Sequence, residues 1–449
     1  MRFRSMGARE IAAGVREKKF SAAEVFEECL RTATDCEDRL SALAAVTAEA
    51  GRIQAKRVDE KVAKGEDPGL LAGVPVVIKD NICANGIRTA AGSRILGDWV
   101  PPYDATAWSL LAGQGAVLLG KGSMDELATG VSDGSAAAVA AGYVPFSLGS
   151  DTGGSIRLPA SYCGIYGLKP TYGLVSRYGM ISYGSSLDQI GPFTRSVEDM
   201  ELVMRVLARH DPKDSTSVSK NEIFARRTNT LKGRRIALVK EFMDFSHTLD
   251  QITADAMKRT IRLFEESGSE VIEVSLPTVA RYAAACYYTI AASEAYTNFA
   301  RFDGVRCGRA AEAAGLREMF ETTRSEGFDG GVKSRIIVGT YLSESDCYEK
   351  YYVAATRVRT LIAEEFYKTF DADRIDCILQ PVTPSLSGKI GELNLYTLTA
   401  NVAGLPAFSL PAGLQIIGPR WSDGELLDIG LEVEKISGAP KIAYFLQRR

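Results

Sequence analysis

A glycine-rich loop carries the residues of this sequence that are best suited to chemistry. It reads Gly149-Ser-Asp-Thr-Gly-Gly-Ser-Ile-Arg157. Consecutive glycines let the backbone turn so that successive N–H groups point at one spot. The amides of Thr152, Gly153 and Gly154 could therefore stabilise an oxyanion, while the hydroxyl of Ser155 attacks a carbonyl carbon. The Gly-Lys-Ser/Thr ending of a phosphate-binding P-loop is absent, so a nucleophilic serine and a purely structural turn are the two interpretations.

The base for such a serine is not expected to be histidine. Only two histidines occur, His210 and His247, each in a polar, charged stretch far from the glycine-rich segments. A Ser-His-Asp triad and a histidine-ligated metal site are therefore not expected. Lys79 ends a predicted buried strand, and burial would lower the pKa of its ammonium and make a neutral amine available as a base. Its alternative interpretation is a lysine that reaches solvent or pairs with Asp80.

Composition excludes several classes of protein. The 449 residues carry a net charge of −3, with 46% hydrophobic and 24% charged residues, so a polybasic surface for nucleic acid or membrane is not indicated. Residues 1–18 are charged and do not form a signal peptide, and no apolar run is long enough to span a bilayer. The eight cysteines are scattered without a Cys-x-x-Cys motif, so we expect reduced thiols in a cytoplasmic protein.

The elements that must position these residues alternate between helix and strand. Ser21-Ala-Ala-Glu24 predicts a capping box at the start of a helix that ends near Thr34. This alternation favours an α/β fold with helices flanking a sheet. The other predicted elements are strands over 71–78, 116–119, 144–148, 235–240, 270–275 and 375–379, and helices over 44–64, 104–112, 134–142, 196–209, 250–267 and most of 282–365.

Three ordered motifs closely resemble the amidase signature family: Gly73-Val-Pro-Val-Val-Ile-Lys-Asp-Asn81, the glycine-rich loop of residues 149–157, and Gly164-Ile-Tyr-Gly-Leu-Lys-Pro-Thr171. The resemblance implies the amidase signature fold, an α/β fold with a mixed, mainly parallel central sheet flanked by helices. It implies a single domain over 1–449, with N-terminal helices over 1–65, a catalytic core over 66–210 and a helical cover over roughly 280–370.

The same resemblance implies an amidase mechanism. The family uses a Ser–cis-Ser–Lys relay, which makes Ser155 the nucleophile and Lys79 the base at the end of the relay. The backbone amides of Thr152, Gly153 and Gly154 would form the oxyanion hole, and no metal is implied.

Within the family, further stretches are most similar to the glutaminase subunits of tRNA-dependent amidotransferases. These stretches are 169–179, 185–192, 300–304 and 401–406. The similarity implies glutamine as substrate and ammonia passed to the partner B and C subunits of a heterotrimer, for transamidation of Glu-tRNA(Gln), with Asp-tRNA(Asn) as a second target. ATP and Mg²⁺ would be used by the partner subunit, which would also make most tRNA contacts, and this chain would hold no cofactor.

The resemblance also identifies candidate substrate-binding residues. Arg335 aligns with the arginine that binds the glutamine α-carboxylate, for which a guanidinium fork is well suited. Tyr287, in preference to Tyr288, aligns with a tyrosine that lines the pocket. Asn394 stands where the family has an aspartate for the α-ammonium group.

The family pattern breaks between Gly130 and Ser135. The alignment puts Val131 at the bridging cis-serine and Ser132 at the next serine, and a segment before them is missing. A second shortening lies near 392–393 and a third near 413–414. All three positions fall where loops are expected, so we predict that the natural protein carries extra residues there and weighs more than 48.5 kDa. The alternatives are a free-standing amidase for small or aromatic amides and an inactive binding subunit with the amidase fold.

Overall fold

An eleven-stranded sheet runs through the computed structural model, which describes residues 2–224, 230–243, 249–385 and 395–440. The strand order is β1-β3-β2-β4-β6-β5-β10-β11-β9-β7-β8. The strands are β1 Leu43–Val46, β2 Pro75–Lys79, β3 Val117–Gly122, β4 Phe146–Asp151, β5 Tyr166–Lys169, β6 Gln189–Thr194, β7 Arg235–Val239, β8 Glu270–Val274, β9 Cys377–Pro381, β10 Ala407–Leu410 and β11 Leu414–Ile417.

The sheet is mixed, as predicted, but it is not mainly parallel. Among the strands of the described ranges, four neighbouring pairs are parallel and six are antiparallel. The parallel pairs form two groups, β3-β2-β4 and β9-β7-β8, in which helices make the crossovers. The antiparallel pairs lie mostly between these groups. One reason is the short connection between β10 and β11, which suits a hairpin rather than a crossover.

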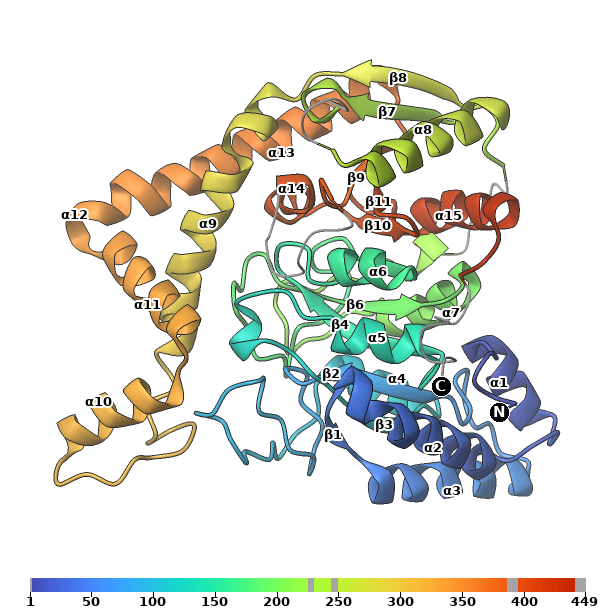
Figure 1. Cartoon of the computed structure of the whole chain (residues 1–449), viewed down its shortest axis with the longest axis vertical. Coiled ribbons are helices and arrows are strands. Elements are labelled where there is room, and N and C mark those ends of the chain that lie inside the picture. The colour runs from blue at the N-terminus through green and yellow to red at the C-terminus, as the bar shows by residue number, and fades with distance from the viewer. Residues whose placement is uncertain (1, 225–229, 244–248, 386–394, 441–449) are drawn as a thin grey trace.

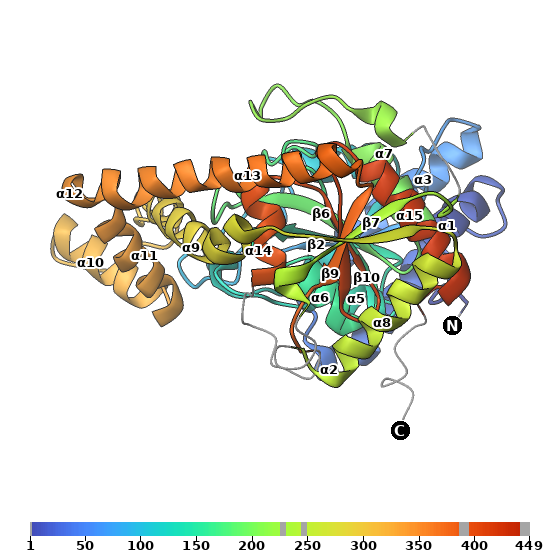
Figure 2. The same cartoon turned by 90° about the horizontal axis from the view of Figure 1, so that it is seen from above.

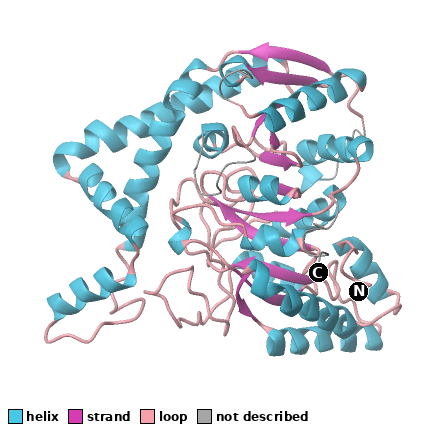
Figure 3. Ribbon diagram, in the orientation of Figure 1, coloured by secondary structure: helices cyan, strands magenta, loops and turns pink. Residues whose placement is uncertain are grey.

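Helices cover the sheet and extend beyond it. Figure 2 shows α7 on one side of the sheet and α5 and α6 on the other, and Figure 3 shows how helix and strand alternate across the molecule. The helices are α1 Ala8–Arg16, α2 Ala22–Leu40, α3 Ala48–Lys64, α4 Thr106–Gly113, α5 Gly134–Ala140, α6 Arg157–Cys163, α7 Val197–Leu207, α8 Gln251–Glu266, α9 Pro277–Phe299, α10 Leu316–Gly327, α11 Gly330–Ser343, α12 Ser345–Tyr348, α13 Ala354–Asp373, α14 Leu395–Ala403 and α15 Asp423–Ser437.

The helical region predicted over 282–365 forms an arm on one side of the sheet (Figure 1). Helices α11 and α13 pack along α9, and α14 packs against the same helix from the sheet side. Phe299 and Ile290 of α9 are fully buried in this contact region. The arm therefore carries α9 and α11, with the predicted substrate-binding residues, beside the edge of the sheet where the glycine-rich loop emerges.

Local sequence signals explain where several helices begin and end. The Ser21 hydroxyl accepts the Glu24 amide and the Glu24 carboxylate accepts the Ser21 amide, so the predicted capping box is confirmed. The helix continues to Leu40 instead of ending near Thr34. Helix α3 ends at Lys64 and is followed by Gly65, whose φ of 73° is readily adopted only by glycine. In the described ranges, no helix has both the length and the apolarity that a membrane crossing would require.

The three breaks in the family pattern have different structural settings. The break at 413–414 lies in a tight hairpin, in which Leu410 pairs with Leu414 and both Ala412 and Gly413 have positive φ. The break between 130 and 135 lies in the loop before α5. The break at 392–393 is outside the described residues.

Candidate active site

The glycine-rich loop lies between the end of β4 and the start of α6. Strands β2, β3 and β4 are parallel, so their carboxyl ends meet at one edge of the sheet, where ligand sites of such sheets are usually found. Gly154 has a φ of 133°, which a residue with a side chain rarely adopts. Ser155 follows it, is only 5% exposed, and donates a hydrogen bond from Oγ to the Gly130 carbonyl oxygen over 3.2 Å.

A buried ion pair holds this loop in place. Arg157 and Asp151 are both fully buried, and two guanidinium nitrogens of Arg157 donate to the two oxygens of Asp151 at 3.1 Å. Arg157 also donates to Asn401 Oδ1 at 2.6 Å and to Gln415 Oε1 at 2.9 Å. Burial alone would raise the pKa of Asp151, but the Arg157 charge and its hydrogen bonds outweigh it and lower the pKa to about 2. The loop is thus fixed to α14 and β11.

The Asp151 carboxylate also determines which loop amides are free to act. It accepts the Gly154 N–H at 2.7 Å and the Ile156 N–H at 3.1 Å. The Gly154 amide, predicted as an oxyanion donor, is therefore directed to Asp151 instead. For the amides of Thr152 and Gly153 the oxyanion role stays a prediction, and the Thr152 hydroxyl donates to Asp188 at 2.5 Å.

Lys79 lies at the end of β2 and is 2% exposed, so its predicted burial is found. Burial lowers the pKa of its ammonium. The carboxylates of Asp125, Asp151 and Asp188 oppose this shift. Lys79 Nζ donates to the Ser150 carbonyl oxygen at 3.5 Å. Within the described ranges no hydrogen bond joins Lys79 to Ser155.

The alternative prediction, that Lys79 pairs with Asp80, is wrong, because Asp80 forms an ion pair with Lys121. The Asp80 carboxylate lies 3.7 Å from Lys121 Nζ, and both side chains are buried. Lys121 also donates to the Ile82 carbonyl at 2.6 Å. Burial lowers the pKa of Lys121 to about 8, although Asp80 opposes the shift.

The loop from which the family segment is missing lies beside Ser155. Asp125 accepts the Gly130 N–H, and the Gly130 carbonyl accepts the Ser155 hydroxyl. Val131, at the position of the bridging serine, packs with Leu158 and Val382. The Ser132 Oγ is buried and has no hydrogen-bond partner among the described residues. Among the described residues, therefore, no hydroxyl bridges Lys79 and Ser155.

The arm brings Tyr287 to the glycine-rich loop. A Cβ atom added to Gly153 would lie 2.6 Å from the Tyr287 hydroxyl oxygen, so the hydroxyl sits against the loop backbone. That hydroxyl is buried and has no hydrogen-bond partner in the described part of the chain. Tyr287 packs edge-to-face on Tyr288, and the Arg335 guanidinium lies 5.6 Å from the centre of the Tyr288 ring. Tyr287 thus contacts the glycine-rich loop directly, and Arg335 lies close to it through Tyr288.

Asn394 and His247 lie outside the described residues. His210 Nδ1 lies 3.1 Å from the Ser217 carbonyl oxygen, in a surface connection. No group of three or more His, Cys, Asp or Glu side chains that could hold a metal ion is present in the ranges that the structure describes.

Sequence reasoning missed the residues that fix the loop. Asp151 and Arg157 both lie within the glycine-rich motif of residues 149–157. An acidic and a basic residue six positions apart, on either side of consecutive glycines, could have indicated an ion pair across the loop. Asn401 and Gln415 lie 244 and 258 residues from Arg157, and although Asn401 begins the stretch 401–406, no local pattern indicated that either residue binds Arg157.

Comparison with known proteins defines the class. A sequence model of the family described as Amidase matches residues 24–133 and 129–427, which is most of the chain. This match, together with the mixed sheet and the serine loop at its edge, shows that the chain belongs to the amidase signature family. The resemblance noted from the three motifs is thereby confirmed.

Individual relatives show which members of the family this chain is similar to. The A subunit of the glutamyl-tRNA(Gln) amidotransferase of Carboxydothermus hydrogenoformans is 43% identical over 474 positions, covering 96% of this chain and 97% of the relative. The crystal structure of the A subunit of the same kind of enzyme from Thermotoga maritima has a TM-score of 0.77 and 32% identity, covering 97% of this chain and 95% of that chain. The peptide amidase of Stenotrophomonas maltophilia shares the fold, with a TM-score of 0.82, 24% identity and coverage of 97% and 98%.

The comparison also bears on the breaks in the pattern. The alignment with the Carboxydothermus protein extends over 474 positions, more than the 449 residues of this chain, so that relative has residues without a counterpart here. The two family matches overlap at 129–133, the stretch that contains Val131 at the position of the bridging serine. That the natural protein carries these residues stays a prediction.

Proposed function

We propose that this chain is the glutamine-hydrolysing subunit of a tRNA-dependent amidotransferase. The observation that carries the proposal is the 43% identity to the A subunit of a glutamyl-tRNA(Gln) amidotransferase over nearly the whole of both chains. Glutamine is hydrolysed here, and the ammonia passes to the companion B and C subunits in the cytoplasm. The companion that carries out the amidation uses ATP and Mg²⁺ and makes most of the contacts with Glu-tRNA(Gln), with Asp-tRNA(Asn) as a second target.

The loop geometry supports acyl transfer to Ser155. Its Oγ attacks the amide carbonyl of glutamine, and the negative oxygen that forms is stabilised by the Thr152 and Gly153 amides. The serine proton moves toward the neutral amine of Lys79 through the bridging serine that the missing segment is predicted to supply, and then to the leaving nitrogen, which departs as ammonia. Water then hydrolyses the acyl-enzyme to glutamate. In this mechanism Asp151 and Arg157 keep the loop rigid and do not touch the substrate.

The arm supports recognition of the amino-acid end of glutamine. The Arg335 guanidinium can bind the α-carboxylate with two parallel hydrogen bonds, and it already lies 5.6 Å from the centre of the Tyr288 ring. The Tyr287 hydroxyl, buried beside Gly153, is placed to donate to the bound substrate. Substrate would thus lie between the arm and the serine loop.

Ammonia release from glutamine by the purified complex of the three subunits tests the proposal. We expect Ser155→Ala to abolish release, and Arg335→Lys to raise KM for glutamine more than it lowers kcat, because a lysine cannot make the paired hydrogen bonds. Arg317→Lys, the same change at an exposed position of α10, serves as the control. Release that is unchanged in Ser155→Ala would overturn the proposal. Activity of the isolated chain on small amides would indicate a free-standing amidase.

One observation favours a second candidate, an inactive subunit that keeps the fold for binding. Val131 occupies the position of the bridging serine, and Ser155 donates to a backbone carbonyl that cannot take its proton. This candidate predicts that the complex forms but releases no ammonia from glutamine, whether or not Ser155 is changed. The same assay therefore separates the two.

A further inference from the structure

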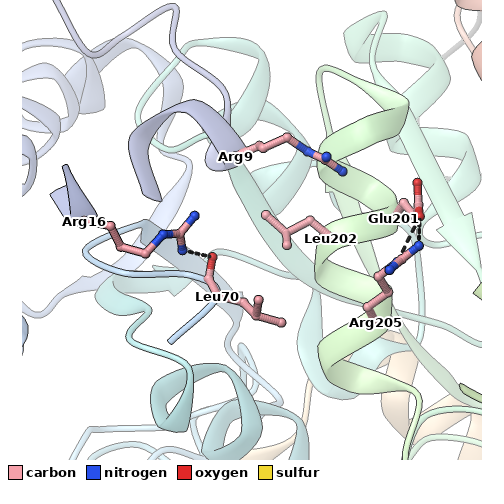
Figure 4. A pocket seen from close by; sticks show the side chains of 6 residues that line it. All are labelled: Arg9, Arg16, Leu70, Glu201, Leu202 and Arg205. Carbon is pink, nitrogen blue, oxygen red and sulfur yellow. Dashed lines mark hydrogen bonds and ion pairs between the residues drawn. The ribbon is translucent and has the colours of Figure 1, made fainter. Parts of the chain in front are cut away.

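A pocket of about 400 Å³ lies between α1 and α7, with Leu70 from the segment before β2 at its lower edge (Figure 4). It is distant from the arm, because α1 and the arm lie on opposite sides of the molecule (Figure 1). Its lining residues are Arg9, Arg16, Leu70, Glu201, Leu202 and Arg205. Nothing in the proposed amidase chemistry uses these residues.

Two of the three guanidinium groups at this pocket lack a close carboxylate among the residues that the structure describes. Arg16 is held by the carbonyl oxygens of Gly69 at 3.1 Å and Leu70 at 3.3 Å, which are neutral acceptors. Arg9 lies 4.0 Å from the nearest Glu198 oxygen, the limit of an ion pair, and both side chains are about half exposed. Arg205, in contrast, is paired with Glu201 at 2.6 Å. The chain as a whole is acidic, at −3, so this local positive charge is not part of a generally basic surface.

Arg9 and Arg16 are positioned to act together. They are seven residues apart on α1, two helical turns, so their side chains leave the same face of the helix about 10 Å apart along its axis. Leu70 is 45% exposed beside them, and Leu202 lines the pocket centre between Arg16 and Arg205. The pocket therefore presents two guanidinium groups, each able to donate paired hydrogen bonds, next to two aliphatic side chains.

This combination of two arginines and two leucines is better suited to binding a protein segment than a nucleic acid. Binding of a nucleic-acid backbone relies on many basic side chains along one face, and single-stranded nucleic acid is also bound by aromatic rings that stack on its bases. Here Arg205 is already paired with Glu201, so two arginines are left to bind an anion, and no aromatic residue of the described ranges lines the pocket. A carboxylate suits a guanidinium fork, and the two leucines suit an aliphatic side chain.

We propose that this pocket is a docking site for an acidic, extended segment of a companion subunit. Its carboxylates bind Arg9 and Arg16, and an aliphatic side chain between them contacts Leu70 and Leu202. In an extended chain, side chains four positions apart share one face about 13 Å apart, with a third side chain midway between them. The two flexible arginines, about 10 Å apart on their helix, can reach carboxylates at that spacing. The inference rests on the proposed function for the identity of the companion, which is the B or the C subunit.

The first test measures assembly of the complex with charge-reversed variants. We expect Arg9→Glu combined with Arg16→Glu to raise the dissociation constant for the B and C subunits by about tenfold or more, with weaker salt dependence. The matched control is Arg259→Glu with Arg262→Glu on α8, which reverses two exposed charges at a distant site. An effect within twofold of the control would overturn the inference. Failure of the unaltered chain to assemble would instead overturn the proposed function.

The second test identifies what occupies the pocket. Leu70 is replaced by the photo-crosslinking residue p-benzoylphenylalanine, and the purified complex is irradiated and digested. We expect a crosslinked peptide from the B or C subunit with two carboxylates about four residues apart and an aliphatic residue midway between them. A crosslink to tRNA, or to a peptide without acidic residues, would overturn the proposal. Amidase activity is expected to be unchanged, since the pocket lies away from Ser155.

Discussion

Replacing Asp151 by asparagine removes one charge from the buried pair that holds the serine loop, with almost no change in shape. The carboxylate accepts two guanidinium nitrogens of Arg157 and the amides of Gly154 and Ile156. Asparagine keeps one acceptor oxygen but turns an NH₂ group toward the Arg157 donors. The buried guanidinium is then left without its counter-charge, while the loop loses the group that orients it.

The structure allows the magnitude to be worked out. The pKa of Asp151 lies at about 2 instead of 3.8, and at about 1.4 kcal/mol per pH unit this corresponds to about 2 kcal/mol of stability at neutral pH. Breaking a buried pair by removing one partner costs about 3–5 kcal/mol, because the other charge stays buried and unpaired. We therefore expect Asp151→Asn to lower the free energy of unfolding by about 3–5 kcal/mol.

Equilibrium unfolding in urea, followed by circular dichroism, provides the assay, with Asp35→Asn on the exposed face of α2 as the control. Because the folded pKa of Asp151 is depressed, its contribution is present above pH 3.8 and is lost as the pH falls toward 2. The difference between wild type and variant should shrink over that interval. Adding Arg157→Met should cost less in the Asp151→Asn background than in wild type. A loss below about 1 kcal/mol would refute the view that this pair holds the loop.

Other substitutions probe the remaining parts of the site. Lys79→Met should reduce kcat by about 100-fold or more, and wild-type activity should rise with pH as the buried ammonium, whose pKa is lowered, loses its proton; a pH-independent rate would contradict this role. Gly153→Ala should lower kcat and disturb the arm, because its Cβ would lie 2.6 Å from the Tyr287 hydroxyl; unchanged kinetics would show that the contact is not maintained. Glu126→Ala should raise KM by loosening α11, since Glu126 accepts the amide of Asp329 at 2.7 Å, and Glu126→Gln should restore it. Mass spectrometry of the natural protein should give a mass above 48.5 kDa, and that mass itself would exclude the extra residues.

Local signals made much of the fold predictable. The capping box at Ser21 satisfies backbone donors within three residues, so sequence alone indicates it. The apolar run before Lys79 likewise indicates a buried strand, and Lys79 lies at its end. Such features depend on neighbours in the chain and not on the rest of the molecule.

Features that depend on distant residues were not predictable. The antiparallel centre of the sheet requires β5 to pair with β10, whose residues follow more than two hundred positions later. Asn401 and Gln415 bind Arg157 across a similar separation. The use of the Gly154 amide by Asp151 depends on the folded conformation of the loop itself. In each case tertiary packing, and not a sequence pattern, decides the partner.

The nucleophilic role of Ser155 is the central claim, and covalent labelling tests it most directly. The assembled complex is treated with a glutamine analogue that carries an electrophilic carbonyl group, and the modified residue is located by peptide mass spectrometry. We predict one adduct per copy of this chain, on the peptide that contains Ser155, which is absent in Ser155→Ala and forms more slowly in Lys79→Met. An adduct on another residue, or one that persists in Ser155→Ala, would contradict the claim.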